Sequence, residues 1–89
     1  MKSAVVTIKP NEHRVMMLIT VEAEYVAQLR NAVTTACGKW LEFMRVQPVA
    51  HSTLMRVWLG LFESAQLAAM SAIVLSLPEA EIGRIQHIE

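Results

Sequence analysis

The chain has 89 residues, of which 54% are hydrophobic, and its eight basic and eight acidic residues give a formal net charge of zero. A chain of this length forms one domain, here taken as residues 1–89, with a small core, and its balanced charge argues against nucleic-acid binding. No apolar run reaches the ~18–20 residues of a membrane span, and the N-terminal run is too short for a signal peptide. The single cysteine excludes an intrachain disulfide. We therefore expect a cytoplasmic protein.

The first strand-like segment covers residues 3–8, and a turn signal follows it at Pro10. Residues 13–21 then form a nearly continuous apolar run, which is typical of a central strand. The segment at 3–8 is one strand more than the rest of the chain requires. Three placements are open for it: the edge of the sheet, another subunit, or an extension of the strand at 13–21 through a kink at Pro10.

Residues 22–37 have the periodicity of an amphipathic helix, with Val26, Leu29 and Val33 on one stripe. Gly38 marks the end of this helix, because glycine readily adopts the left-handed conformation that closes a helix. Two strands follow, at residues 39–47 and 53–62, with a hairpin loop at 48–52 between them.

The second helix is expected at residues 64–77 and contains no charged residue. A helix that is apolar on all sides is normally buried on more than one of them. We expect one side to pack on the sheet, through Leu67, Met70, Val74 and Leu77. We expect the other side to meet a partner subunit, through the small residues Ala65, Ala68, Ala69 and Ala72. Pro78 ends this helix, and the last strand is expected at 81–88.

The pattern of strand, acidic turn, helix and strand occurs twice, around Val21 and again around Phe62. Two such units joined by a hairpin predict a ferredoxin-like βαββαβ sandwich of the α+β class. Its antiparallel sheet carries both helices on one face and leaves the other face open. We expect the surplus of hydrophobic residues to be buried between subunits, and therefore a homo-oligomer of two or more chains.

Alternation along the strands assigns side chains to the two faces of the sheet. The inward residues are Val15, Met17, Ile19 and Val21 with Met55, Val57, Leu59 and Leu61. The open face carries Arg14, Met16, Leu18 and Thr20 beside Leu54, Arg56, Trp58 and Gly60. Because the first and third strands are neighbours, we expect Arg14, Met16, Arg56 and Trp58 to form one patch. The alternation leaves the faces of Arg84 and of the strand at 39–47 undecided.

Three interpretations of this patch are open. The first is a sheet-to-sheet interface formed by Met16, Leu18 and Trp58, with the arginines paired to Glu42 or to a partner's carboxylate. The second is a site for a small anionic ligand, in which Arg14 and Arg56 bind a carboxylate or phosphate and Trp58 stacks beside it. The third is single-stranded nucleic acid, which the zero net charge and the lack of an aromatic pair on adjacent central strands disfavour.

The three histidines, His13, His51 and His87, are expected at one end of the sheet, where they are weak candidates for a metal site. No His-x-His or His-x-x-x-His spacing supports a metal, and strand ends can lie over ~10 Å apart. We therefore expect three solvated side chains and no metal or other cofactor. Cys37 ends the first helix, where the helix dipole disfavours a thiolate, and is interpreted as a small apolar core residue.

The order of the elements resembles that of ACT-type regulatory modules and of small α+β-barrel proteins whose sheets pack face to face. The glycine-bearing turn that ACT modules use for amino acids is replaced here by Val-Glu-Ala-Glu-Tyr at residues 21–25, so no site residue is transferred. Two functions fit the sequence. One is an oligomeric, regulatory module that binds a small ligand or a partner protein; the other is a small barrel-type enzyme with its site around Arg14 and Arg56 on the open face.

Overall fold

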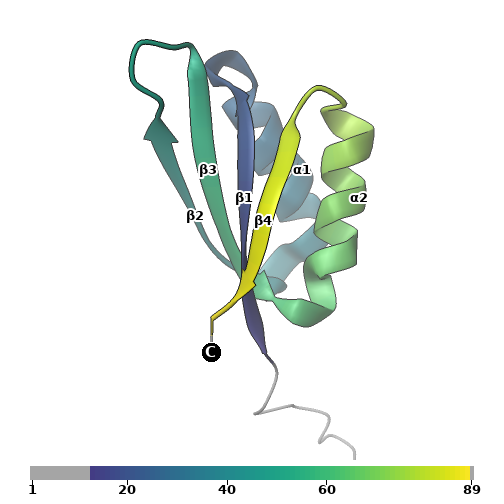
Figure 1. Ribbon diagram of the computed structural model, residues 1–89. Helices are drawn as coiled ribbons and strands as arrows, with labels where there is room; N and C mark the ends of the chain where they lie inside the picture. Colours follow the sequence, from purple (N-terminus) through teal and green to yellow (C-terminus); the bar gives the residue numbers. More distant parts are fainter. Residues whose placement is uncertain (1–12, 89) are drawn as a thin grey trace, which may run out of the picture.

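The structure is a computed structural model that describes residues 13–88 (Figure 1). In this range the chain forms β1 (Arg14–Glu22), α1 (Val26–Cys37), β2 (Leu41–Pro48), β3 (Leu54–Phe62), α2 (Gln66–Ser76) and β4 (Glu81–His87). The strands make one antiparallel sheet in the order β2-β3-β1-β4, and both helices cover the same face (Figure 1). The ferredoxin-like arrangement is thereby confirmed. The strand expected at 3–8 lies outside the described residues.

The core lies between the sheet and the helices and consists of apolar side chains. Fully buried are Val15, Met17 and Ile19 of β1, Val57, Leu59 and Leu61 of β3, and Leu29 and Val33 of α1. Every second residue of the two central strands therefore points inward, as the alternation predicted. Truncating one of these large side chains to alanine costs about 2–5 kcal/mol in comparable cores, so this layer determines the stability of the domain.

The helix α2 packs on the sheet through a stripe of residues spaced four apart: Ala65 in the turn before it, Ala69, Ile73 and Leu77. Such a spacing places side chains on one side of a helix. Leu67 and Val74, expected on the sheet, are instead 74% and 57% exposed. The expectation was wrong for these two residues, and it was also wrong for Ala65 and Ala69, which were expected at a subunit interface.

The physical reason for this difference is steric. The helices α1 and α2 pack against each other as well as against the sheet, and alanine at 65 and 69 leaves room for α2 in that corner. Two other expectations for α2 were correct, because Leu77 is buried and Met70 packs against the core. Residues 13–88 contain no helix that is long and apolar enough to cross a membrane.

A β-bulge decides which residues of β2 face the core. The pairing of β2 with β3 shifts its register between Leu41 and Phe43, and one extra residue reverses the alternation. Leu41 and Met44 consequently pack against the core, while Phe43 lies on the open face over Gly60. A Cβ atom at Gly60 would stand 2.1 Å from the Phe43 ring, so the ring occupies the space that a side chain at Gly60 would need.

Each helix begins with one turn of 3-10 helix, and the two turns are anchored in the same way. The turn Ala23–Tyr25 precedes α1, and Glu63–Ala65 precedes α2. The first residue of each turn donates its backbone N–H to a carbonyl at a neighbouring strand end, 2.8 Å away, Ala23 to Thr53 and Glu63 to His13. The repeat seen in the sequence therefore corresponds to a repeated joint between sheet and helix.

Candidate functional site

The two arginines expected to form one patch on the open face lie far apart along the strands. Arg14 is opposite Phe62 in the pairing of β1 with β3, whereas Arg56 is opposite Thr20, six positions further along β1. At ~3.4 Å per residue this separates their rows by about 20 Å. The expectation that Arg14, Met16, Arg56 and Trp58 form one patch is therefore wrong, because the two arginines do not lie together. Alternation assigns a face, but the antiparallel register decides the position along it.

Arg14 already has partners within the chain. Its Nε atom lies 3.1 Å from Oε1 of Glu42, and its guanidinium carbon lies 5.6 Å from the centre of the Phe62 ring. The pairing with Glu42 that the sequence suggested is thus present. The side chains of both residues keep contact with solvent, so the pair contributes little to stability, and it leaves part of the guanidinium fork available.

The middle of the open face is apolar and aromatic. In the strand pairing Leu18 is opposite Trp58, and Met16 is opposite Gly60, over which the Phe43 ring lies. Arg45 is opposite Trp58 on the other side, with its guanidinium carbon 6.0 Å from the centre of the Phe43 ring. Of the predicted contact residues, Met16, Leu18 and Trp58 therefore lie together. Phe43 completes this surface. Alternation alone did not assign it to this face, because the bulge reverses the alternation along β2.

The three histidines do not share one end of the sheet. His13 and His87 do meet, with ring centres 6.3 Å apart in an edge-to-face arrangement. His51 lies in the β2–β3 hairpin, three residues before Leu54, which is opposite Glu22 at the far end of β1. The expectation was wrong for His51 because β2 runs in the same direction as β1, so the hairpin after β2 lies where β1 ends.

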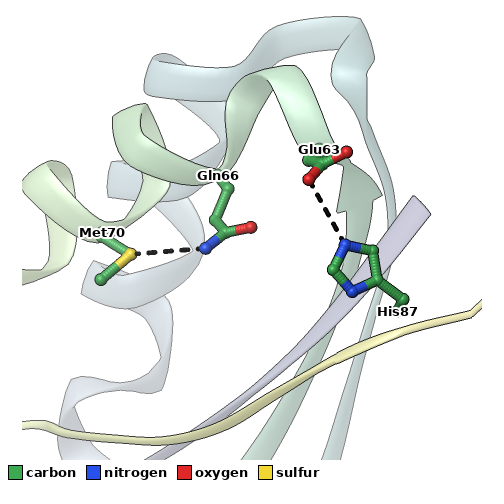
Figure 2. Close-up of polar contacts among 4 residues, drawn as sticks. All are labelled: Glu63, Gln66, Met70 and His87. Atoms are coloured by element: carbon green, nitrogen blue, oxygen red, sulfur yellow. Dashed lines mark hydrogen bonds and ion pairs between the residues drawn. The ribbon is translucent and has the colours of Figure 1, made fainter. Parts of the chain in front are cut away.

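Figure 2 shows the surroundings of His87, whose Nε2 atom lies 3.3 Å from Oε2 of Glu63. In the same view the side-chain amide of Gln66 approaches the sulfur of Met70 at 4.0 Å. His87 and Glu63 are both largely exposed. Among residues 13–88 there is no group of three or more potential ligands that could hold a metal ion.

Cys37 is buried at the end of α1, and its Sγ atom lies 3.9 Å from the carbonyl oxygen of Ala65. Burial raises the pKa of the Cys37 thiol, because the apolar surroundings disfavour the charged thiolate. The interpretation as a core residue is confirmed, and a thiol held in its neutral form has little nucleophilic reactivity.

A cavity of about 530 Å³ opens at the end of the sheet where β1 enters α1 and α2 returns into β4, the upper end in Figure 1. Its lining residues are Thr20, Val21, Glu22, Tyr25, Gln28, Leu54, Ser76, Leu77, Pro78, Glu79, Ala80 and Glu81. They come from both halves of the repeat, and a contact between the helices joins them: the Gln28 side chain donates a hydrogen bond of 3.0 Å to the Ser76 carbonyl.

The lining of the cavity has one sign of charge. Glu22, Glu79 and Glu81 contribute three carboxylates, and no lysine, arginine or histidine is among the lining residues. Glu22 accepts a hydrogen bond of 2.6 Å from the Thr53 hydroxyl, which orients its carboxylate. This site was not predicted from the sequence, because its acidic residues lie on segments far apart in the chain. Its only sign in the sequence is the acidic residues of the turns at 22–24 and 79–81.

No model of a known protein family matches the sequence, and no curated protein matches it either.

Proposed function

We propose that the protein is a small ligand-binding module whose ligand is an organic cation with an apolar body, bound in the cavity at the Glu22 end of the sheet. The observation that carries this proposal is the cavity itself. Its volume of about 530 Å³ lies within the ~300–1,000 Å³ of small-molecule sites. Pockets of this size at the junction of several elements are the usual place for a small ligand.

The charge of the lining supports a cation. Three carboxylates line the cavity, and no basic side chain in the lining balances them. The cavity also includes Ser76 and Leu77 at the C-terminal end of α2, where the helix dipole is negative. An ammonium group would gain charge-assisted hydrogen bonds there, whereas an anion would meet only repulsion.

The floor of the cavity supports an apolar body on the ligand. Val21 and Leu77 are buried at 4% and 5% exposure, and both face the cavity together with Leu54. Tyr25, 39% exposed, offers an aromatic ring on which an organic cation can rest. A simple inorganic ion would leave these surfaces uncovered, which favours an organic cation over a metal ion.

The geometry gives less support to the two functions expected on the open face. A small anionic ligand would need Arg14 and Arg56 to converge, and their rows lie about 20 Å apart. The barrel-type enzyme was expected to use the same two residues as a polar cluster. A ligand in the cavity instead contacts the β1–α1 joint of the first half and the α2–β4 connection of the second, so its binding favours the folded arrangement of the two halves, which is compatible with a regulatory module.

The test uses 1,6-diaminohexane, which carries two ammonium groups on an apolar stem. We expect it to shift backbone amide resonances of residues 20–25 and 76–81 in a titration followed by NMR, with a Kd below about 1 mM at about 20 mM salt. The matched probes are 1,6-hexanediol, which lacks the charge, and adipate, which reverses it. Both should bind at least about tenfold more weakly if charge selects the ligand.

Two sets of variants separate this site from general attraction to a surface charge. The double variant Glu79→Gln/Glu81→Gln should weaken diaminohexane binding about fivefold. Glu24→Gln, which removes an exposed carboxylate outside the cavity lining, should leave it unchanged. Shifts scattered over the surface, equal binding of the diol, or equal effects of both sets of variants would each overturn the proposal.

A further inference from the structure

The open face of the sheet is a second surface that the cavity does not account for. It presents Met16, Leu18, Phe43, Trp58 and Phe62 on three neighbouring strands. These side chains are half-buried or exposed, with Phe43 at 38%. Contiguous apolar surface of this kind, with aromatic, Met and Arg residues, is typical of the centre of a protein interface.

The dimensions of this face suit a dimer interface. Four strands spaced ~4.8 Å apart and about nine residues long at ~3.4 Å each cover roughly 600 Å² before the relief of the side chains is counted. A stable interface buries about 800 Å² of accessible surface on each partner. Packing of two such faces, about 10 Å apart, would therefore bury enough surface for a specific dimer.

The charges on β1 identify the partner as a second copy of this chain. The apolar residue Leu18 lies at the centre of the strand, Arg14 lies four residues before it and Glu22 four residues after it. All three are on the open face by alternation. We propose that two copies pack their open faces together about a two-fold axis that crosses β1 at Leu18, so that Arg14 of each copy faces Glu22 of the other.

The alternative two-fold axis, parallel to the strands, would bring the two Arg14 side chains together at one end and the two Glu22 side chains together at the other. Like charges across an interface cost several kcal/mol, so the charge pattern selects the crossing axis. An interface with such an axis is self-complementary by symmetry. Arg14 can keep its contact with Glu42, because a guanidinium group has five donors.

Two arginines are brought near their own symmetry copies: Arg84, at the level of Leu18 on the edge strand β4, and Arg45. Arg45 lies opposite Trp58 on β2, and β2 is an edge strand of the sheet. An exposed arginine at an edge can extend its charge into solvent while its apolar stem stays on the interface. Both arginine pairs therefore belong to the rim, where charges have small effects on affinity.

The experiment measures the dimer dissociation constant by sedimentation equilibrium at about 50 mM salt. Arg14→Glu and Glu22→Arg should each raise it at least about tenfold, because each creates two like-charge contacts per dimer. The double variant, which exchanges the two charges, should return it to within about threefold of the original value. Arg30→Glu on α1 and Glu24→Arg, both exposed and away from the open face, are the matched controls and should change nothing.

A distance measurement tests the axis independently of these charges. A nitroxide label attached at Ala50→Cys in the β2–β3 hairpin reports where the two hairpins lie, since Cys37 is buried. The crossing axis should separate the labels by more than about 30 Å, whereas the parallel axis would bring them within about 20 Å.

The possible outcomes separate cleanly. A monomer at millimolar concentration would overturn the dimer. A dimer with a short hairpin distance, or one in which the double charge exchange fails to restore affinity, would overturn the proposed axis. A distance above about 30 Å between the two labels, together with restored affinity in the double variant, supports both the dimer and its axis. These measurements are made without a cavity ligand, so a failure of the proposed function would leave their outcome unchanged.

Discussion

At the scale of single residues, Gly60 offers the sharpest test of the open face. The Phe43 ring lies where a Cβ atom at Gly60 would have to be, at 2.1 Å, so Gly60→Ala must displace the ring or the strand. We expect a loss of about 1–3 kcal/mol in the free energy of unfolding, measured by urea denaturation. Gly83→Ala is the control, because its nearest contact would be an ordinary 3.4 Å, and it should cost much less.

The same position can be checked with a double-mutant cycle. If the loss comes from the collision with the ring, Phe43→Ala should abolish most of the cost of Gly60→Ala. Equal costs of Gly60→Ala with and without the ring would show that the glycine is required by the backbone instead.

The buried thiol of Cys37 is expected to make the stability of the protein depend on pH. Burial raises the pKa of its thiol above the ordinary value of about 8.5, so above that pH the unfolded chain releases a proton that the folded chain retains. The contribution of Cys37 to the free energy of unfolding is therefore complete below about pH 8.5 and is lost as the pH rises toward the folded-state pKa. Cys37→Ala should show a smaller fall in stability between about pH 7.5 and about pH 9.5.

At the scale of elements, the sequence predicted the orientation of an element whose two sides differ in polarity. It failed for an element whose sides are alike. The alternation of β1 identified Val15, Met17 and Ile19 as core residues. The helix α2 has no polar side, so a helical wheel contains no signal that orients it. Two small residues, Ala65 and Ala69, proved to face the core together with Ile73 and Leu77, so the space beside α1 and the sheet, rather than polarity, orients α2.

The orientation of α2 leads to a stability prediction. Leu67, expected on the sheet but 74% exposed, should tolerate replacement by lysine with a change of less than about 0.5 kcal/mol. Ala69 is fully buried against the core, so Ala69→Leu should lose about 1–3 kcal/mol through overpacking. Urea denaturation of both variants distinguishes this orientation from the one expected from the sequence, in which the order of the two losses would be reversed.

At the scale of the whole molecule, the repeat in the sequence was sufficient for the topology but not for the sites. The sites depend on register and strand direction, which bring together residues that are distant in the chain. The open face illustrates the first dependence, since Arg14 and Arg56 share a face but not a position. The cavity illustrates the second, because β1 ends beside the start of β4, and Glu22 thereby lines the same cavity as Glu79 and Glu81.

The cavity and the open face meet at the Glu22 end of the sheet, and Glu22 couples the two proposals. Glu22 lines the cavity and, in the proposed dimer, faces Arg14 of the second copy. An organic cation bound beside Glu22 would neutralise part of its charge and weaken that contact. Because coupling between two equilibria is reciprocal, dimer formation must weaken cation binding by the same factor.

We therefore expect saturating 1,6-diaminohexane to raise the dimer dissociation constant about two- to fivefold at low salt, as measured by sedimentation equilibrium. The neutral 1,6-hexanediol should have no such effect. The double variant Glu79→Gln/Glu81→Gln should still dimerise and should respond less to the diamine, since it retains Glu22 but binds the cation weakly. A diamine that binds in the cavity and leaves the dissociation constant unchanged would place the dimer contact elsewhere than at Glu22.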